Sequence, residues 1–113
     1  ASTTSTTFVY VGSDSAYTSL TFTPGNHDAS VTWYFEAIIA STGGADTATA
    51  GLYNVTDAAQ VGQVAVVGTT RTLVRSAALT MPVAEKTLAI SLKATGGSTT
   101  YLYAARIIGV VPV

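Results

Sequence analysis

The sequence predicts an all-β fold, an antiparallel two-sheet sandwich of about eight strands with a jelly-roll-like arrangement. Apolar and polar residues alternate with a period of two along most of the chain. Turn-forming residues separate these segments, and none of helical length shows a 3.6-residue period. A chain of 113 residues without Cys is long enough for one domain and has no disulfides. We therefore expect a single β-sandwich domain at residues 8–113, preceded by a flexible N-terminal arm at residues 1–7.

The first half of the chain contains the strongest single strand. The segment 31–40 places Trp33, Phe35 and Ile39 on one face, and we expect this face to lie in the core. Four shorter segments are also predicted as strands, and the last of them directly precedes Gly68. They are residues 8–11, 17–22, 47–53 and 61–67.

The second half adds three long segments, at residues 72–81, 87–94 and 99–111. The alternation in the middle segment directs Leu88, Ile90 and Leu92 inward and leaves the other side in solvent. That solvent side consists of Ala89, Ser91 and Lys93. The pairs Gly43-Gly44 and Gly96-Gly97 each follow a core strand and predict two similar hairpins.

Charged residues are scarce, which indicates that the protein associates with copies of itself or with other proteins. Asp, Glu, Lys and Arg make up 10% of the chain, against about 25% in typical soluble domains, and the net charge is −1. Electrostatic repulsion between copies is therefore weak. We expect a homo-oligomer or a protein that docks on a lattice; the alternative is a well-covered sandwich with a neutral surface.

The charges are unevenly distributed along the chain. Residues 1–70 contain five acids and no base, whereas residues 71–113 contain five bases and one acid. Early and late strands interleave in a jelly roll, so we expect Glu36 to pair with Arg75 or Arg106 within the chain. Contacts between neighbouring subunits are the alternative. The bases form no stripe, so we expect no nucleic-acid partner.

The sequence predicts that the protein is not an enzyme and has no metal site and no cofactor. Its acidic residues are scattered singly, it has one His and no Cys, and no Ser lies in a Gly-x-Ser-x-Gly turn. Asn26-His27-Asp28 directly follows Pro24-Gly25 and is interpreted as a polar turn. Asn54-Val55-Thr56 matches the glycosylation acceptor pattern, but a strand that ends in a turn is the favoured interpretation.

Two groups of residues are candidates for binding. Tyr34, Tyr53 and Tyr101 are predicted to face solvent and to offer a platform on which a glycan stacks. The second group follows the Thr-rich arm and is predicted to reach a neighbouring subunit as an added strand. It consists of Phe8, Val9, Tyr10 and Val11.

The sequence also limits the location of the protein. No apolar run approaches the roughly 20 residues that span a bilayer, so we expect no membrane insertion. Residues 1–4 have neither the basic nor the apolar region of a signal peptide. Because the chain starts at Ala1, we expect removal of a Met or of a longer leader.

Four stretches carry a resemblance to a known group of proteins. They are residues 34–37, 51–57, 75–79 and 103–108, with the sequences YFEA, GLYNVTD, RSAAL and YAARII. From the start of the first to the end of the last, they extend over about two thirds of the chain. The chain resembles small β-sandwich modules of phage virion proteins, which include capsid decoration proteins and tail-associated domains. The resemblance implies a jelly-roll-like module on a repetitive surface and assigns no binding residue.

These observations together predict a non-enzymatic structural protein, in a virion or outside the cell, that assembles with itself or on a capsid or another protein lattice. Two alternatives remain. One is a carbohydrate-binding module, and the other is an extracellular filament subunit that assembles by strand donation.

Overall fold

The computed structural model describes residues 2–10, 19–23 and 30–111. These residues form strands and loops and contain no helix, which confirms the predicted all-β class. The strands are β1 (Ser2–Thr3), β2 (Val9–Tyr10), β3 (Ser19–Phe22), β4 (Thr32–Ser41), β5 (Thr47–Asn54), β6 (Ala59–Val67), β7 (Thr72–Arg75), β8 (Lys86–Lys93) and β9 (Thr100–Val110).

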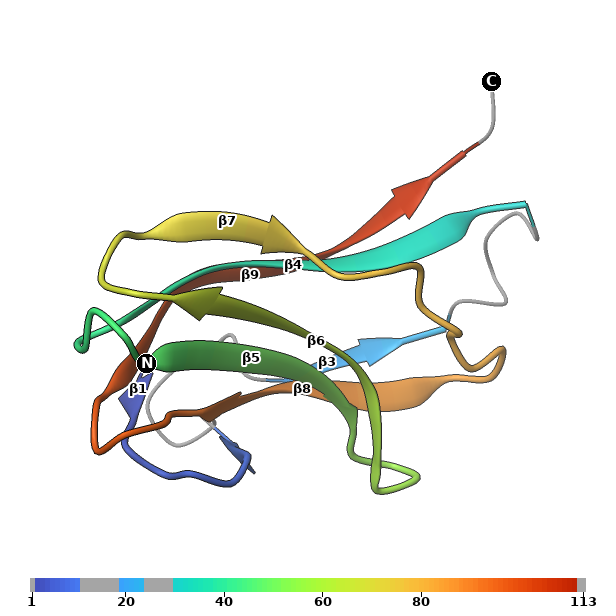
Figure 1. Ribbon diagram of the computed structural model, residues 1–113. Helices are drawn as coiled ribbons and strands as arrows, with labels where there is room; N and C mark the ends of the chain where they lie inside the picture. Colours follow the sequence, from blue (N-terminus) through green and yellow to red (C-terminus); the bar gives the residue numbers. More distant parts are fainter. Residues whose placement is uncertain (1, 11–18, 24–29, 112–113) are drawn as a thin grey trace.

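The strands form two antiparallel sheets, which Figure 1 shows as an upper and a lower layer. Sheet A has the order β1-β9-β4-β7. Sheet B has the order β2-β8-β5-β6, and β3 also pairs with β8. Tyr10 lies opposite Ser91, and Ser19 lies opposite Ala89. β2 and β3 therefore follow one another along the same edge of β8.

The strand pairs are nested along the chain. β1 pairs with β9, β2 and β3 pair with β8, β4 pairs with β7, and β5 pairs with β6. Early strands thus lie beside late strands, and the acidic half of the chain meets the basic half. Glu36 on β4 lies between Arg75 on β7 and Arg106 on β9, so the predicted pairing within the chain is confirmed.

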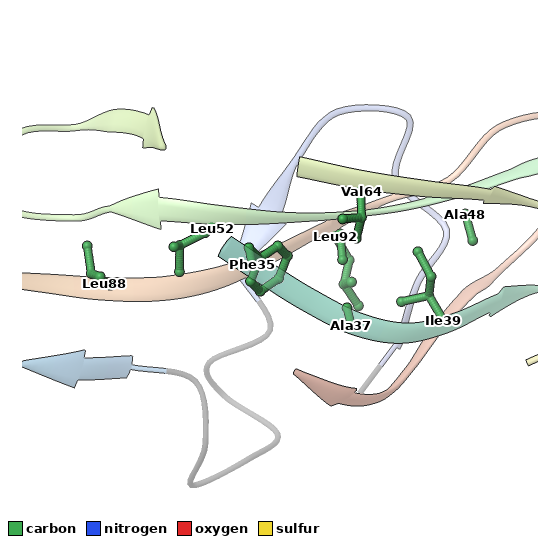
Figure 2. Packing of buried hydrophobic residues seen from close by; sticks show 9 residues of the cluster. Phe35, Ala37, Ile39, Ala48, Leu52, Val64, Leu88 and Leu92 are labelled. Carbon is green, nitrogen blue, oxygen red and sulfur yellow. The ribbon is translucent and has the colours of Figure 1, made fainter. Parts of the chain in front are cut away.

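The two sheets share one hydrophobic core, which gives the molecule a sandwich-like form. Figure 2 shows Phe35, Ala37 and Ile39 of β4 pointing toward residues of β5, β6 and β8. Phe35, Ile39 and Leu92 have no exposed surface at all. The predicted core face of residues 31–40 is therefore confirmed for its central residues, while Trp33 is half-buried. Successive side chains of a strand point to opposite faces, which explains why the alternation in the sequence predicted the core face.

The two Gly-Gly segments are corners between the sheets, so the prediction of two hairpins was wrong. Residues 42–46 connect β4 of sheet A with β5 of sheet B, and residues 94–99 connect β8 with β9 in the opposite direction. The corners bind each other, because Thr42 N donates to Thr99 O at 3.0 Å and Ser98 Oγ donates to Asp46. Gly96 and Gly97 have the positive φ values of 64° and 78° that such a corner requires.

The predicted strand at residues 72–81 is shorter than expected. β7 ends at Arg75 because Ser76 takes over the contact with β4. Its amide donates to Phe35 O, and its hydroxyl accepts from Phe35 N at 3.0 Å. The chain then returns to β4 only at Leu79, whose amide donates to Trp33 O.

The side of β8 that was predicted to face solvent is largely covered. Ala89 and Ser91 are 8% and 2% exposed, and only Lys93 of that side is half-buried. Ser91 lies opposite Gly51, where the side chain of Gln60 packs across the strand. The alternation was correct, but small residues on this face allow a neighbouring side chain to cover it.

Candidate functional site

β9 is the strand that presents the most candidate binding residues. It pairs with β4 along almost its whole length, from Thr100 to Val110, but β1 pairs only with Thr100 and Tyr101. Beyond these two residues, no strand in the described part of the chain covers the other side of β9. Tyr101, Tyr103 and Val110 are each more than 40% exposed. A strand edge of this kind can present main-chain N–H and C=O groups to an added strand.

A buried carboxylate organises the outer face of sheet A. Glu36 is 4% exposed, although it lies on the outer face, because two arginines close over it. Arg75 Nε donates to Glu36 Oε2 at 2.6 Å, and Arg106 Nε donates to Oε1 at 2.8 Å. The two arginine side chains remain 48% and 64% exposed. The ladder Arg106–Glu36–Arg75 therefore crosses three strands and presents guanidinium groups to solvent.

The ladder also controls the protonation of Glu36. The hydrogen bond from Arg75 lowers the pKa of Glu36 most strongly, and Arg106 lowers it further, while burial of the carboxylate raises the pKa. The net result is a pKa below the ordinary value of 4.5. Glu36 is thus ionised at neutral pH and holds both guanidinium groups in fixed orientations.

A shallow hollow lies beside this ladder. Its volume is about 230 Å³, and its apolar lining includes Ile38, Leu73 and Ala104, which are paired across β7, β4 and β9. Glu36 and Arg106 form its polar wall. The small side chain of Ala104 leaves the space open, and Leu73 is 54% exposed beside it. The hollow can accept one apolar side chain. A negatively charged group next to that side chain could pair with Arg106.

Aromatic and cationic side chains extend the surface toward the start of β9. The rings of Tyr101 and Tyr103 are stacked with their centroids 6.4 Å apart. The Arg71 guanidinium lies 4.0 Å from the centroid of Tyr103, and that of Arg75 lies 5.0 Å from the ring centroid of Tyr34. These distances are within the range of cation–π attraction. Tyr and Arg are also the residue types enriched in protein interfaces.

The structure separates the three tyrosines that were predicted to form a glycan platform. Tyr34 and Tyr101 lie on sheet A, and Tyr53 lies on β5 of sheet B. The neighbour that Tyr101 does have is Tyr103, which the sequence analysis missed. Tyr101 and Tyr103 are two residues apart on one strand, so alternation was the available signal that they share a face.

Leu73, Ala104 and Arg71 were also missed as members of this surface. The alternation of Leu73 with Arg75, and of Ala104 with Arg106, was the available signal. It indicates which residues share a face, but it does not indicate which strands are neighbours.

The N-terminal residues lie against the chain's own sheets. Ser2 and Thr3 pair with β9, Ser5 O accepts a hydrogen bond from Ala94 N, and Val9 pairs with Leu92 of β8. Tyr10 lies opposite Ser91, Phe8 is half-buried with Lys93 Nζ 4.6 Å from its ring centroid, and Val11 lies outside the described residues. A role of residues 8–11 in contacting a neighbouring subunit stays a prediction.

The remaining polar candidates form turns or lie outside the described residues. Asn54 is 5% exposed; its Nδ2 donates to Asp57 Oδ2, and its Oδ1 accepts from Asp57 N. These bonds confirm the turn interpretation of the Asn54 segment. Asn26, His27 and Asp28 lie outside the described residues. Within residues 2–10, 19–23 and 30–111, no three metal-binding side chains of His, Cys, Asp or Glu come together.

Comparisons with known proteins found no match for the chain. No protein-family model matches it, and neither does any curated protein or solved structure. In the described part of the chain, there is no helix with the length and apolar character needed to cross a membrane.

Proposed function

We propose that this chain is a non-enzymatic structural protein that assembles with copies of itself, or on a repetitive protein lattice such as a virion shell. The observation that carries the proposal is β9, an eleven-residue strand with exposed large side chains, one edge of which pairs only with β1 among the described strands. Native proteins usually protect such edges with charges, Pro or a covering segment, and β9 contains one charged residue and no Pro. A partner surface is the physical reason for such an edge to remain open.

We also propose that the sandwich is a jelly roll. With β2 and β3 taken as one interrupted edge strand, the first strand pairs with the last, the second with the next to last, and so on inward to β5 and β6. This nested pairing supports a single long antiparallel hairpin rolled into two sheets. Virion proteins use double-sheet jelly rolls, so the topology agrees with a place in a virion or another extracellular assembly.

Size-exclusion chromatography with light scattering tests the proposed function, together with electron microscopy of concentrated samples and co-sedimentation with candidate capsids. We expect concentration-dependent oligomers or binding to a lattice. A monodisperse monomer at high concentration that binds no lattice would refute the proposal.

A carbohydrate-binding module is the second candidate, and the Tyr101–Tyr103 pair favours it. The two rings are 41% and 43% exposed and lie close together on one face. Stacking of a sugar on exposed rings is the physical mechanism. A glycan array on the wild type and on Tyr101→Ala, Tyr103→Ala, Tyr34→Ala and Tyr53→Ala tests it. Loss of binding only on the first two supports this pair, and absence of any glycan binding removes the candidate.

A filament subunit that assembles by strand donation is the third candidate. The pairing of the chain's own Ser2 and Thr3 with this edge of β9 supports the candidate. A donated segment would extend along the open edge and satisfy its main-chain groups. Deletion of residues 1–7 should then leave a folded domain with weaker assembly, whereas unchanged assembly would rule out donation by these residues.

A further inference from the structure

The most exposed large apolar side chain in the described residues lies outside β9. Val83 is 77% exposed and belongs to the segment between β7 and β8. Pro82 precedes it and fixes one backbone angle, which lowers the entropy lost when the segment is held by a partner. Glu85, two residues later, is also exposed. Residues 82–85 therefore present a branched apolar group beside a carboxylate.

The hollow on sheet A is complementary to this segment, because it is apolar and has a positive charge at its wall. Ile38, Leu73 and Ala104 give it an apolar lining, and Arg106 stands at its wall. Glu36 Oε1 occupies the side of the Arg106 guanidinium formed by Nε and Nη2. The Nη1 hydrogens therefore point away from Glu36 and have a fixed orientation, which suits a second carboxylate.

The two surfaces are complementary in chemistry, and their key residues have the same separation in sequence. Val83 and Glu85 are two residues apart, as are Ala104 and Arg106, and residues two apart are separated by at most about 7 Å. The outer face of sheet A also carries three arginines and a single carboxylate in the region of the hollow. Its positive charge attracts the acidic segment of a second copy.

We propose that Val83 of one copy occupies the hollow lined by Ile38, Leu73 and Ala104 on a second copy, while Glu85 pairs with Arg106. This contact rests on the proposed self-assembly and specifies its geometry. In the proposed arrangement each copy offers its Val83 to one neighbour and its hollow to another. Such heterologous contacts produce closed rings or open filaments.

Substitutions at two exposed residues test the two sides of the contact, Val83 and the hollow, separately. Val83→Ser removes the apolar group, and Ala104→Trp fills the hollow. Each should raise the concentration needed for half-maximal association at least about tenfold, because each eliminates the burial of the Val83 side chain. Val67→Ser is the matched control, since Val67 is 66% exposed on β6 and lies outside the contact. Circular dichroism verifies folding, and Leu73→Ser is a second hollow variant if Ala104→Trp misfolds.

Sedimentation velocity of the two variants, alone and mixed, provides the decisive measurement. Wild type and Val67→Ser should form oligomers, and each contact variant should be monomeric at the same concentration. An equimolar mixture of Val83→Ser with the hollow variant should form one-to-one dimers and nothing larger, because one intact Val83 meets one intact hollow. The contact is also expected to weaken as salt increases.

The outcomes separate this contact from the proposed function. If the wild type assembles and the variants assemble equally well, or if the mixture forms no dimer, the contact is wrong and self-assembly stands. If the wild type remains monomeric at all concentrations, the contact is refuted, and co-sedimentation with a lattice then decides the proposed function.

Discussion

Small side chains are buried on β5, whereas large side chains are exposed on β9. β5 consists mainly of small residues, yet Ala48, Thr49 and Ala50 are at most 3% exposed. β9 contains large side chains, and Tyr101 and Tyr103 are more than 40% exposed. Residue type alone would suggest the reverse, because large apolar and aromatic residues gain most from burial.

The position of each strand in its sheet explains the difference. β5 lies between β6 and β8 in sheet B and faces β4 across the core, so small side chains suffice to fill the space around it. β9 has β4 on one side and only the two residues of β1 on the other. Within the described residues, some of the largest side chains of the chain therefore lie where no other strand covers them.

The largest effect is expected for a core residue of β5. Leu52 is 1% exposed, so Leu52→Ala should lower the free energy of unfolding by about 2–5 kcal/mol through lost burial and a residual cavity. Tyr103→Ala on β9 should lower it by about 1 kcal/mol or less, because the ring is already largely in solvent. Urea unfolding of both variants measures the difference. Equal losses would mean that β9 is as deeply integrated as β5.

A second prediction concerns the tight packing of small residues on β5. A Cβ at Gly51 would collide with the Gln60 amide and lie 2.9 Å from Ser91 Oγ. The exposed Gln60 side chain can move aside, whereas Ser91 is buried, so we expect Gly51→Ala to destabilise the protein by about 1 kcal/mol. Gly44→Ala is the control, because a Cβ there meets no atom within 4 Å, and it should be neutral or stabilise by up to about 1 kcal/mol. If both variants unfold at the wild-type urea concentration, the covered face of β5 is not close-packed.

The pH dependence tests how Glu36 connects β9 to the rest of sheet A. The pKa of Glu36 is lowered in the folded protein, so its contribution to stability is fully present above the ordinary pKa of 4.5. That contribution is lost as the pH falls through the lower folded pKa. Glu36→Gln should therefore be less stable than the wild type at pH 7, and the two stabilities should converge in strong acid. A gap that is the same at both pH values would contradict the ladder.

The two arginines of the ladder should contribute unequally. The hydrogen bond from Arg75 is the main cause of the lowered pKa of Glu36. Arg75→Gln should consequently raise this pKa more than Arg106→Gln, as measured by NMR titration of the carboxyl group. The reverse order would show that β9, rather than β7, dominates the environment of Glu36.

Periodicity predicted which side chains face inward, and it could not predict which strands are neighbours. Phe35, Ile39, Leu88 and Leu92 were identified as core residues because alternation depends only on local geometry. The corners at Gly43-Gly44 and Gly96-Gly97 were interpreted as hairpins because a Gly pair indicates a turn but not the sheet to which the chain proceeds. Strand pairing is set by contacts between distant residues.

The candidate site shows the same limit. Pairing of Glu36 with Arg75 and Arg106 could be predicted, because complementary charges in the two halves of the chain have to meet in an interleaved fold. The hollow at Ala104 could not, since it depends on Leu73 of β7 and Ala104 of β9 lying on either side of β4. Tyr103 could have been predicted as the neighbour of Tyr101, because residues two apart on a strand share a face.

The smallest effect is expected for the side-chain contacts that order the exposed part of β9. Arg71 lies 4.0 Å from the Tyr103 ring centroid, and this contact is worth about 0.5–1 kcal/mol at an exposed site. A double-mutant cycle with Arg71→Gln and Tyr103→Leu should give a coupling energy in that range, measured under conditions that keep the protein monomeric. Arg71→Lys should retain part of it, because Lys keeps the charge but not the planar group.

A coupling energy of zero would show that Arg71 does not hold the ring, and that the Tyr101–Tyr103 surface is not ordered before a partner binds. Coupling in this range would mean that the surface is preorganised by weak contacts on the solvent side, whereas β5 is held by burial.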